Sequence, residues 1–99
     1  MKLGTKLMSQ ACDGEIIVIR ADGVTEPPEA GGVPMAAERS GVQGEPNGDG
    51  FDLGKRFELL DESAGIRLEL LVTKPGTSTL SWRGQPLVLK QTKPLPSSD

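Results

Sequence analysis

The chain has 99 residues and a mass of 10.5 kDa, which is room for one domain or one very small domain with an appendage. Its composition, 35% hydrophobic and 25% charged, is ordinary for a folded protein. Only three residues are aromatic and none is His, which excludes Ser-His and Cys-His catalysis within this chain and His-containing zinc sites. We therefore expect a small aliphatic core and no enzyme activity.

The charge is nearly balanced, with a net −3 for the whole chain. Residues 1–50 contribute −4 and residues 51–99 contribute +1. Because the sequence has neither a basic stripe nor a long apolar run, we expect no nucleic-acid partner and no membrane span. The N-terminus lacks the apolar stretch of a signal peptide, and a single Cys cannot form an internal disulfide. These features together predict a cytoplasmic protein.

The first part of the chain has two β-like runs. Residues 2–8 are short and mixed, whereas residues 15–20 contain four consecutive β-formers and predict a strand. The dipeptide Asp13-Gly14 between the runs favours a turn. Ile16 and Val18, or alternatively Ile17 and Ile19, would face the core.

Residues 21–50 differ sharply in composition, with seven Gly and four Pro in 30 positions. So few bulky apolar side chains predict a loop, and we expect residues 39–50 to be the most mobile. Within this stretch, residues 34–39 begin with Pro and favour a single helical turn.

The alternating pattern of residues 66–72 predicts a strand with one apolar face, and it anchors a predicted β-meander over residues 55–92. A Pro-Gly turn at 74–77, a strand at 79–83, a tight turn at Arg83-Gly84 and a strand through Leu87 and Leu89 complete the pattern. Residues 56–60 favour the first strand, with a short helix over 57–63 as the alternative. Residues 93–99 form a Pro-containing tail that is extended or frayed.

A strand lies between two turn-like segments in the first third of the chain: the segments are residues 9–14 and 30–35, and the predicted strand is residues 15–20. In this order the chain resembles desulforedoxin and the N-terminal domain of desulfoferrodoxin, where two cysteine-bearing knuckles flank a strand and four thiolates hold one iron. The resemblance covers about a third of the chain and implies a small β-fold of rubredoxin type. Ser9 stands at the position of the first Cys, Cys12 at the second, and Ala30 and Gly31 at the adjacent pair.

The ligand count argues against a metal within one chain. Rubredoxin-type iron and structural zinc need four tetrahedral Cys or His ligands, and this chain offers the thiolate of Cys12 alone. Ser9 is a poor ligand at neutral pH, and Ala30 and Gly31 offer no ligating side chain. We therefore expect no metal and no cofactor. The alternative is a metal or electron-transfer site that uses Cys12 across a dimer.

Cys12 itself has three interpretations. It is a half-buried apolar residue at a turn, a reactive or redox-sensing thiol, or a thiol that pairs between molecules. The adjacent acids Asp13 and Glu15 disfavour a lowered thiol pKa, while Lys6 on the preceding strand would favour it.

The remaining motifs have simple structural interpretations. Gly31-Gly32 lacks the spacing of a phosphate loop and predicts backbone with positive φ. The carboxylates at Asp61-Glu62 predict a solvated turn, and those at Asp49 and Asp52 lack an evident cleft. Trp82 is a core or lid residue, with partner contact as the alternative.

Together these features predict one small all-β domain over residues 1–92. It comprises a knuckle-like unit (1–36), a flexible Gly/Pro-rich loop (37–54) and the β-meander (55–92). The predicted function is a non-catalytic binding or accessory protein for an unknown protein partner, with Cys12 and Trp82 as candidate contacts. Exposed strand edges also favour a homodimer.

Overall fold

The computed structural model describes residues 2–41 and 43–90, and the regular elements in this part of the chain are β-strands apart from one 3-10 turn, η1, at Glu62–Ala64. The strands in chain order are β1 Lys6–Met8, β2 Glu15–Asp22, β3 Glu29–Ala30, β4 Val33–Pro34, β5 Arg56–Asp61, β6 Ile66–Lys74, β7 Leu80–Trp82, β8 Gln85–Pro86 and β9 Val88–Leu89. The predicted all-β class is confirmed. No helix among these residues is long and apolar enough to cross a membrane.

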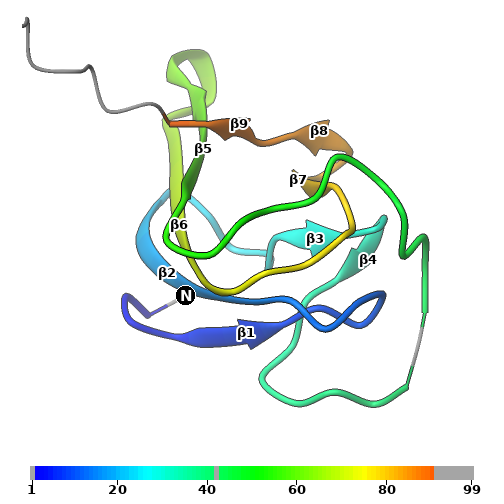
Figure 1. Cartoon of the computed structure of the whole chain (residues 1–99). Helices are drawn as coiled ribbons and strands as arrows, with labels where there is room; N and C mark the ends of the chain where they lie inside the picture. The colour runs from blue at the N-terminus through cyan, green and yellow to red at the C-terminus, as the bar shows by residue number, and fades with distance from the viewer. Residues whose placement is uncertain (1, 42, 91–99) are drawn as a thin grey trace, which may run out of the picture.

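The strands form two antiparallel sheets (Figure 1). Sheet A has the order β1-β2-β6-β5-β9, and sheet B has the order β4-β3-β7-β8. The chain passes from sheet B back to sheet A at Leu87, whose backbone N–H donates to the carbonyl of Leu80 on β7. The two sheets are therefore joined by chain that is itself hydrogen-bonded.

The centre of sheet A is the long pair of β2 and β6, and its residues explain its position. Ile16 and Val18 on β2 are fully buried, which settles which of the two faces of this strand packs inward. On β6 the alternate residues Leu68, Leu70 and Val72 are buried, as the period of two predicts. Two register shifts along β2 add the bulges that curve the sheet around its core.

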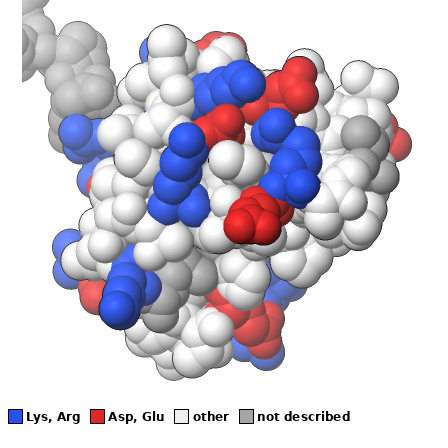
Figure 2. Space-filling model, turned by 90° about the horizontal axis from the view of Figure 1, so that it is seen from below, with Lys and Arg blue, Asp and Glu red and all other residues white. Residues whose placement is uncertain are grey.

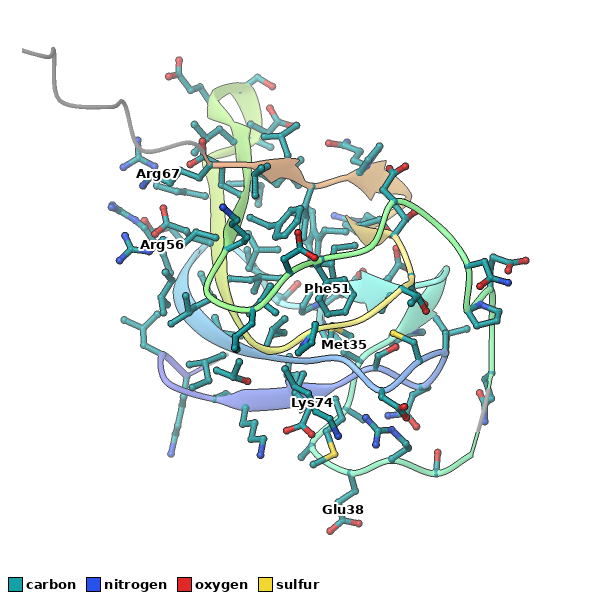
Figure 3. All side chains as sticks on the ribbon, viewed as in Figure 1. Met35, Glu38, Phe51, Arg56, Arg67 and Lys74 are labelled. Carbon is teal, nitrogen blue, oxygen red and sulfur yellow. The ribbon has the colours of Figure 1, made fainter. Side chains whose placement is uncertain are left out.

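The core draws its side chains from both halves of the chain. Ile16 and Val18 pack in one cluster with Leu80, Met35 and Phe51. Figure 3 shows Phe51 and Met35 between the sheets, whereas Arg56 and Arg67 point outward from sheet A. This shared cluster joins residues 1–36 to residues 55–90, as expected for a unit too small to hold a core alone.

The predicted meander over residues 55–92 is corrected by the sheet assignment. Strands β5, β6 and β9 belong to sheet A, but β7 and β8 belong to sheet B. The chain does not turn back at 74–77, because Gly76 exchanges two backbone hydrogen bonds with Phe51 and continues into the other sheet. The Phe51 ring lies so close to the backbone of Gly14 and Gly76 that a Cβ at either position would collide with it.

Three local expectations are decided by the structure. Residues 56–60 lie in strand β5, so the alternative helix over 57–63 is wrong beyond the single turn η1. The helical turn expected at 34–39 is also wrong, because Pro34 lies in β4 and Ala36 bridges to Met8. The tight turn at Arg83-Gly84 is confirmed, with φ of 50° and 80°, the positive values that a two-residue hairpin requires.

The described residues of the loop over 37–54 form no named strand, yet much of their path is held by backbone hydrogen bonds. The backbone N–H groups of Gly48 and Gly50 donate to the carbonyls of Thr77 and Ser78, and the N–H of Glu45 donates to Gly31. These bonds attach the second half of the loop to the segment between β6 and β7 and to the turn between β3 and β4. The predicted tail, residues 93–99, lies outside the described residues.

Candidate functional site

Cys12 lies in the connection between β1 and β2, and the hydroxyl of Ser9 shapes this connection. The fully buried Ser9 Oγ accepts the backbone N–H groups of Ala11 and Cys12, each at 3.0 Å. The Cys12 Sγ lies 3.3 Å from the same oxygen. Because two amides occupy the oxygen's acceptor positions, the hydroxyl proton of Ser9 is free to point at the sulfur.

Hydrogen bonds make the thiol of Cys12 unusually acidic. Partial burial raises its pKa, but the hydroxyls of Ser78 and Ser9 and the backbone of Gly14 and Ser78 outweigh that effect and lower the pKa from 9.0 to about 7. The thiolate is therefore a major form of this residue at neutral pH. The sequence-based expectation that the neighbouring acids disfavour a lowered thiol pKa is therefore wrong, because hydrogen bonds from Ser78, Ser9 and Gly14 lower it.

Ser78 couples the thiol to the loop. Its hydroxyl is buried and donates to the carbonyl of Glu45 at 2.9 Å. A hydroxyl carries only one proton, so Ser78 must turn this proton away from Glu45 when it stabilises the thiolate of Cys12. Ser78 therefore lies beside both the thiol of Cys12 and the loop at Glu45.

The thiol opens into a hollow of about 390 Å³, which we call the thiol cleft. Its walls include Cys12, Arg39, Pro46, Pro75 and Thr77. The cleft thus combines one nucleophile, the cation Arg39 and the carboxylate of Asp13 with proline walls.

Arg39 is held in place by a residue that the sequence alone did not single out. The Nε of Arg39 donates to the carbonyl of Ser9 at 3.2 Å. The buried Gln10 binds both neighbours of Arg39: its Nε2 donates to the carbonyl of Glu38 at 2.9 Å, and its Oε1 accepts the N–H of Ser40 at 2.8 Å. Gln10 is therefore the positioning residue for this side of the thiol cleft.

Lys6, which we considered as a partner for the thiol, is engaged elsewhere. Its Nζ lies 2.7 Å from Glu15, and Lys74 lies 4.0 Å from the same carboxylate. Figure 2, which views the molecule from below, shows basic and acidic side chains interspersed on this face. Figure 3 places Lys74 and Glu38 on the same lower side.

The positions of the second predicted knuckle are less open. Gly31 and Gly32 have φ of 67° and 83°, so the predicted positive φ is confirmed. A Cβ on Gly31 would collide with the carbonyl of Glu45 and would lie 2.8 Å from the Cβ of Ala11. Ala30 is fully buried in the core. A thiol at position 31 is therefore incompatible with the present path of the loop.

Metal-binding groups are sparse in the part of the chain that the structure describes. No three His, Cys, Asp or Glu side chains gather there in a way that could hold a metal ion. Ser9 and Cys12 together supply one hydroxyl and one thiol. The metal or electron-transfer alternative through Cys12 across a dimer stays a prediction.

Trp82 is a core residue and does not share the thiol cleft. Its side chain is only 4% exposed, and the indole N–H donates to the carbonyl of Glu26 at 3.0 Å. The guanidinium of Arg83 lies 5.4 Å from the centre of the ring. A ring covered in this way is not accessible as a contact, so Cys12 is the candidate residue that remains at the surface.

The carboxylate pairs divide between a turn and a separate hollow. Asp61 caps η1, where its side chain accepts hydrogen bonds from Ser63 and from the N–H of Ala64, and these bonds hold its pKa below the usual value. Asp49 and Asp52 line a different hollow of about 350 Å³. Neither pair meets Cys12.

No protein-family model matches the chain, and no curated protein or solved structure matches it either. The resemblance to desulforedoxin therefore stays a prediction from the residues at 9–14 and 30–35.

Proposed function

We propose that the chain is a non-catalytic accessory protein that binds a protein partner at the thiol cleft, with the thiolate of Cys12 as the contact. The observation that carries this proposal is the position of the Cys12 sulfur. It is half-buried in a cleft, and four hydrogen bonds lower its pKa to about 7. A thiolate that is available at neutral pH is the form that reacts.

The chemistry that fits this contact is reversible thiol–disulfide exchange. The thiolate of Cys12 attacks one sulfur of a disulfide on the partner, a new S–S bond forms, and the other sulfur leaves as a thiolate. The partner's disulfide supplies the oxidation, so no further oxidant is needed. Ser9 and Ser78 stabilise the attacking anion, and Pro46 and Pro75 line the cleft through which the partner approaches.

A reducing compartment suits this function, since it keeps the half-buried thiol of Cys12 reduced until it meets a partner whose disulfide is itself transient. We therefore place the protein in the cytoplasm. We also infer that the scaffold descends from a desulforedoxin-like knuckle that has lost its ligands. The support is Ser9, whose oxygen accepts two amides at the place where the resemblance expects the first ligand sulfur.

The experiment compares two small aromatic disulfides, one dianionic and one neutral, as probes of Cys12. Arg39 lies in the cleft wall, so Arg39→Gln should slow the dianionic probe about threefold and leave the neutral probe unchanged. Arg83→Gln is the matched control, because Arg83 packs on Trp82 away from the cleft. Equal slowing of both probes by Arg39→Gln would mean that the arginine does not act through charge in the cleft.

The binding step is tested by trapping. The native chain should form a mixed disulfide with a defined cellular protein, and reductant should release that protein. Cys12→Ser should trap none of it. If Cys12→Ser captures the same protein in the same amount, the partner binds elsewhere and the proposed role of the thiol cleft is wrong.

A further inference from the structure

A second surface, on the outer face of sheet B, has features that the thiol cleft does not share. Ala30, Leu80 and Trp82 fill the inner face of this sheet. Glu29 on β3 and Ser81 on β7 are register partners on the opposite, outer face, and nothing in the described chain covers that face as a further layer. It is therefore an unpartnered sheet face.

This face is hollowed. A depression of about 430 Å³ lies over β3, β7 and β8, and its far wall is the loop at Glu45 and Asn47. Since a water molecule occupies about 30 Å³ of liquid, the depression holds on the order of ten waters, enough for a long side chain with its flanking backbone. We call this depression the acidic hollow, because Glu29 and Glu45 line it.

Among the described residues, the charged side chains that line the acidic hollow are the carboxylates of Glu29 and Glu45, and no Lys or Arg of this part of the chain lines it. The cation that follows β7, Arg83, is turned toward Glu26, at 3.6 Å, and packs on Trp82. The surrounding chain reinforces this sign, because residues 22–52 contain seven acidic residues and one basic residue. Within the described residues, this face thus presents negative charge.

Both carboxylates are held in place before any ligand arrives. The Oε1 of Glu29 accepts hydrogen bonds from Ser81 Oγ and from the N–H of Gly84, each at 3.1 Å. The side chain of Glu45 accepts the N–H of Asn47 at 3.1 Å, and its backbone N–H donates to the carbonyl of Gly31. Fixed acceptors of this kind lose little conformational freedom when a cation binds.

The edges of sheet B exclude one mode of binding. The edge strands are β4 and β8, and each includes a proline, Pro34 and Pro86, which cannot donate a backbone hydrogen bond. A partner strand would find a poor edge to extend. Recognition must therefore come from side chains that enter the acidic hollow from above the face.

We propose that the acidic hollow binds a basic protein segment, with an Arg or Lys side chain seated between Glu29 and Glu45. The guanidinium of Arg suits this position best, because its planar donors can engage a carboxylate with two hydrogen bonds. This proposal goes beyond the thiol cleft and does not depend on Cys12. It gives the protein a second binding surface, which recognises a positively charged side chain.

The test uses a short fluorescent peptide of alternating Arg and Gly at low ionic strength. The double variant Glu29→Gln, Glu45→Gln should weaken binding by about tenfold or more. Gln can still accept the hydrogen bonds from Ser81, Gly84 and Asn47, and thermal unfolding verifies that the variant is folded. The control double variant Glu58→Gln, Glu62→Gln removes the same charge from the β5 and η1 region and should change binding less than about twofold.

Three results would overturn the proposal. Equal weakening by both double variants would mean that the peptide responds to net charge alone. No binding of the peptide to the native chain would remove the site. Competition by calcium beyond that of sodium chloride at matched ionic strength would assign the hollow to a metal cation. Because all these measurements work equally well with Cys12→Ser, their outcome is separate from that of the proposed function.

Discussion

The hydroxyl of Ser9 is the most informative single group to remove. It accepts two backbone N–H groups and it lowers the pKa of Cys12, and the two roles are measured separately. Ser9→Ala leaves the buried N–H group of Ala11 and the partly buried N–H group of Cys12 without their acceptor. An unsatisfied buried donor costs about 1–3 kcal/mol and the partly exposed N–H of Cys12 costs less, so we expect a loss of about 2–4 kcal/mol in the free energy of unfolding. That is a large fraction of the stability of a small domain but not all of it.

The same substitution should raise the pKa of Cys12. Ser9 is one of several groups whose hydrogen bonds together lower this pKa to about 7. Losing one of them should move the pKa up by about one unit and reduce the thiolate fraction at neutral pH from about one half to about one tenth.

The assay is the ultraviolet absorbance of the thiolate during a pH titration. The chain contains no Tyr, so Cys12 is the group that changes this absorbance near neutral pH. Ser63→Ala, which removes an exposed hydroxyl in η1, serves as the control and should leave the midpoint unchanged. An unchanged midpoint in folded Ser9→Ala would refute the account of how the thiolate is stabilised.

Four further predictions follow from the same structure. The folded pKa of Cys12 lies below its ordinary 9.0, so the free energy of unfolding should increase by on the order of 1 kcal/mol as the pH is raised from about 7 to 9. This gain should be lost as the pH is lowered through about 7, and urea titrations of Cys12→Ser should not show it. Elemental analysis after dialysis against a chelator should find less than stoichiometric iron and zinc, and one metal per chain would contradict the ligand count. Gly31→Cys should lower the melting temperature, since φ is 67° and the carbonyl of Glu45 blocks the side chain; an unchanged melting temperature would be inconsistent with this packing. Hydrogen exchange should find the amides of Gly48 and Gly50 protected, and exchange at the rate of an unfolded chain would disagree with their bonds to Thr77 and Ser78.

Features of the fold that depend on neighbouring residues could be predicted from the sequence. The alternation along residues 66–72 identifies strand β6 and its buried face, and Arg83-Gly84 identifies a hairpin turn. The division into two sheets could not be predicted in this way. It depends on the pairing of Phe51 with Gly76, two positions whose own neighbours carry no sign of it.

The residues of the candidate site also divide into those that the sequence predicts and those that only the tertiary structure identifies. The sequence singled out Cys12 and placed Ser9 beside it, but as the position of a missing ligand. It gave no indication of Ser78, which lies in the segment between β6 and β7 and acts on the thiol, or of Gln10, which holds the segment around Arg39. Buried serines and glutamines resemble any other polar residue until tertiary structure shows what they face.

The expected homodimer finds few free edges in sheet A. Met8 on β1 already exchanges backbone hydrogen bonds with Ala36. The opposite edge, β9, pairs with β5 over only two residues, Val88 and Leu89, and both side chains are exposed. Self-association through β9 stays a prediction, and sedimentation of the native chain beside Val88→Lys would test it, because a charge at that position should dissociate such a dimer.

The measurement that tests the central claim most directly is the pH dependence of Cys12 alkylation in the folded and the urea-unfolded chain. We predict a midpoint near 7 in the folded protein and near the ordinary 9.0 in the unfolded one. Equal midpoints in the two states would show that the fold does not stabilise the thiolate, and would remove the basis for the thiol cleft as a binding site.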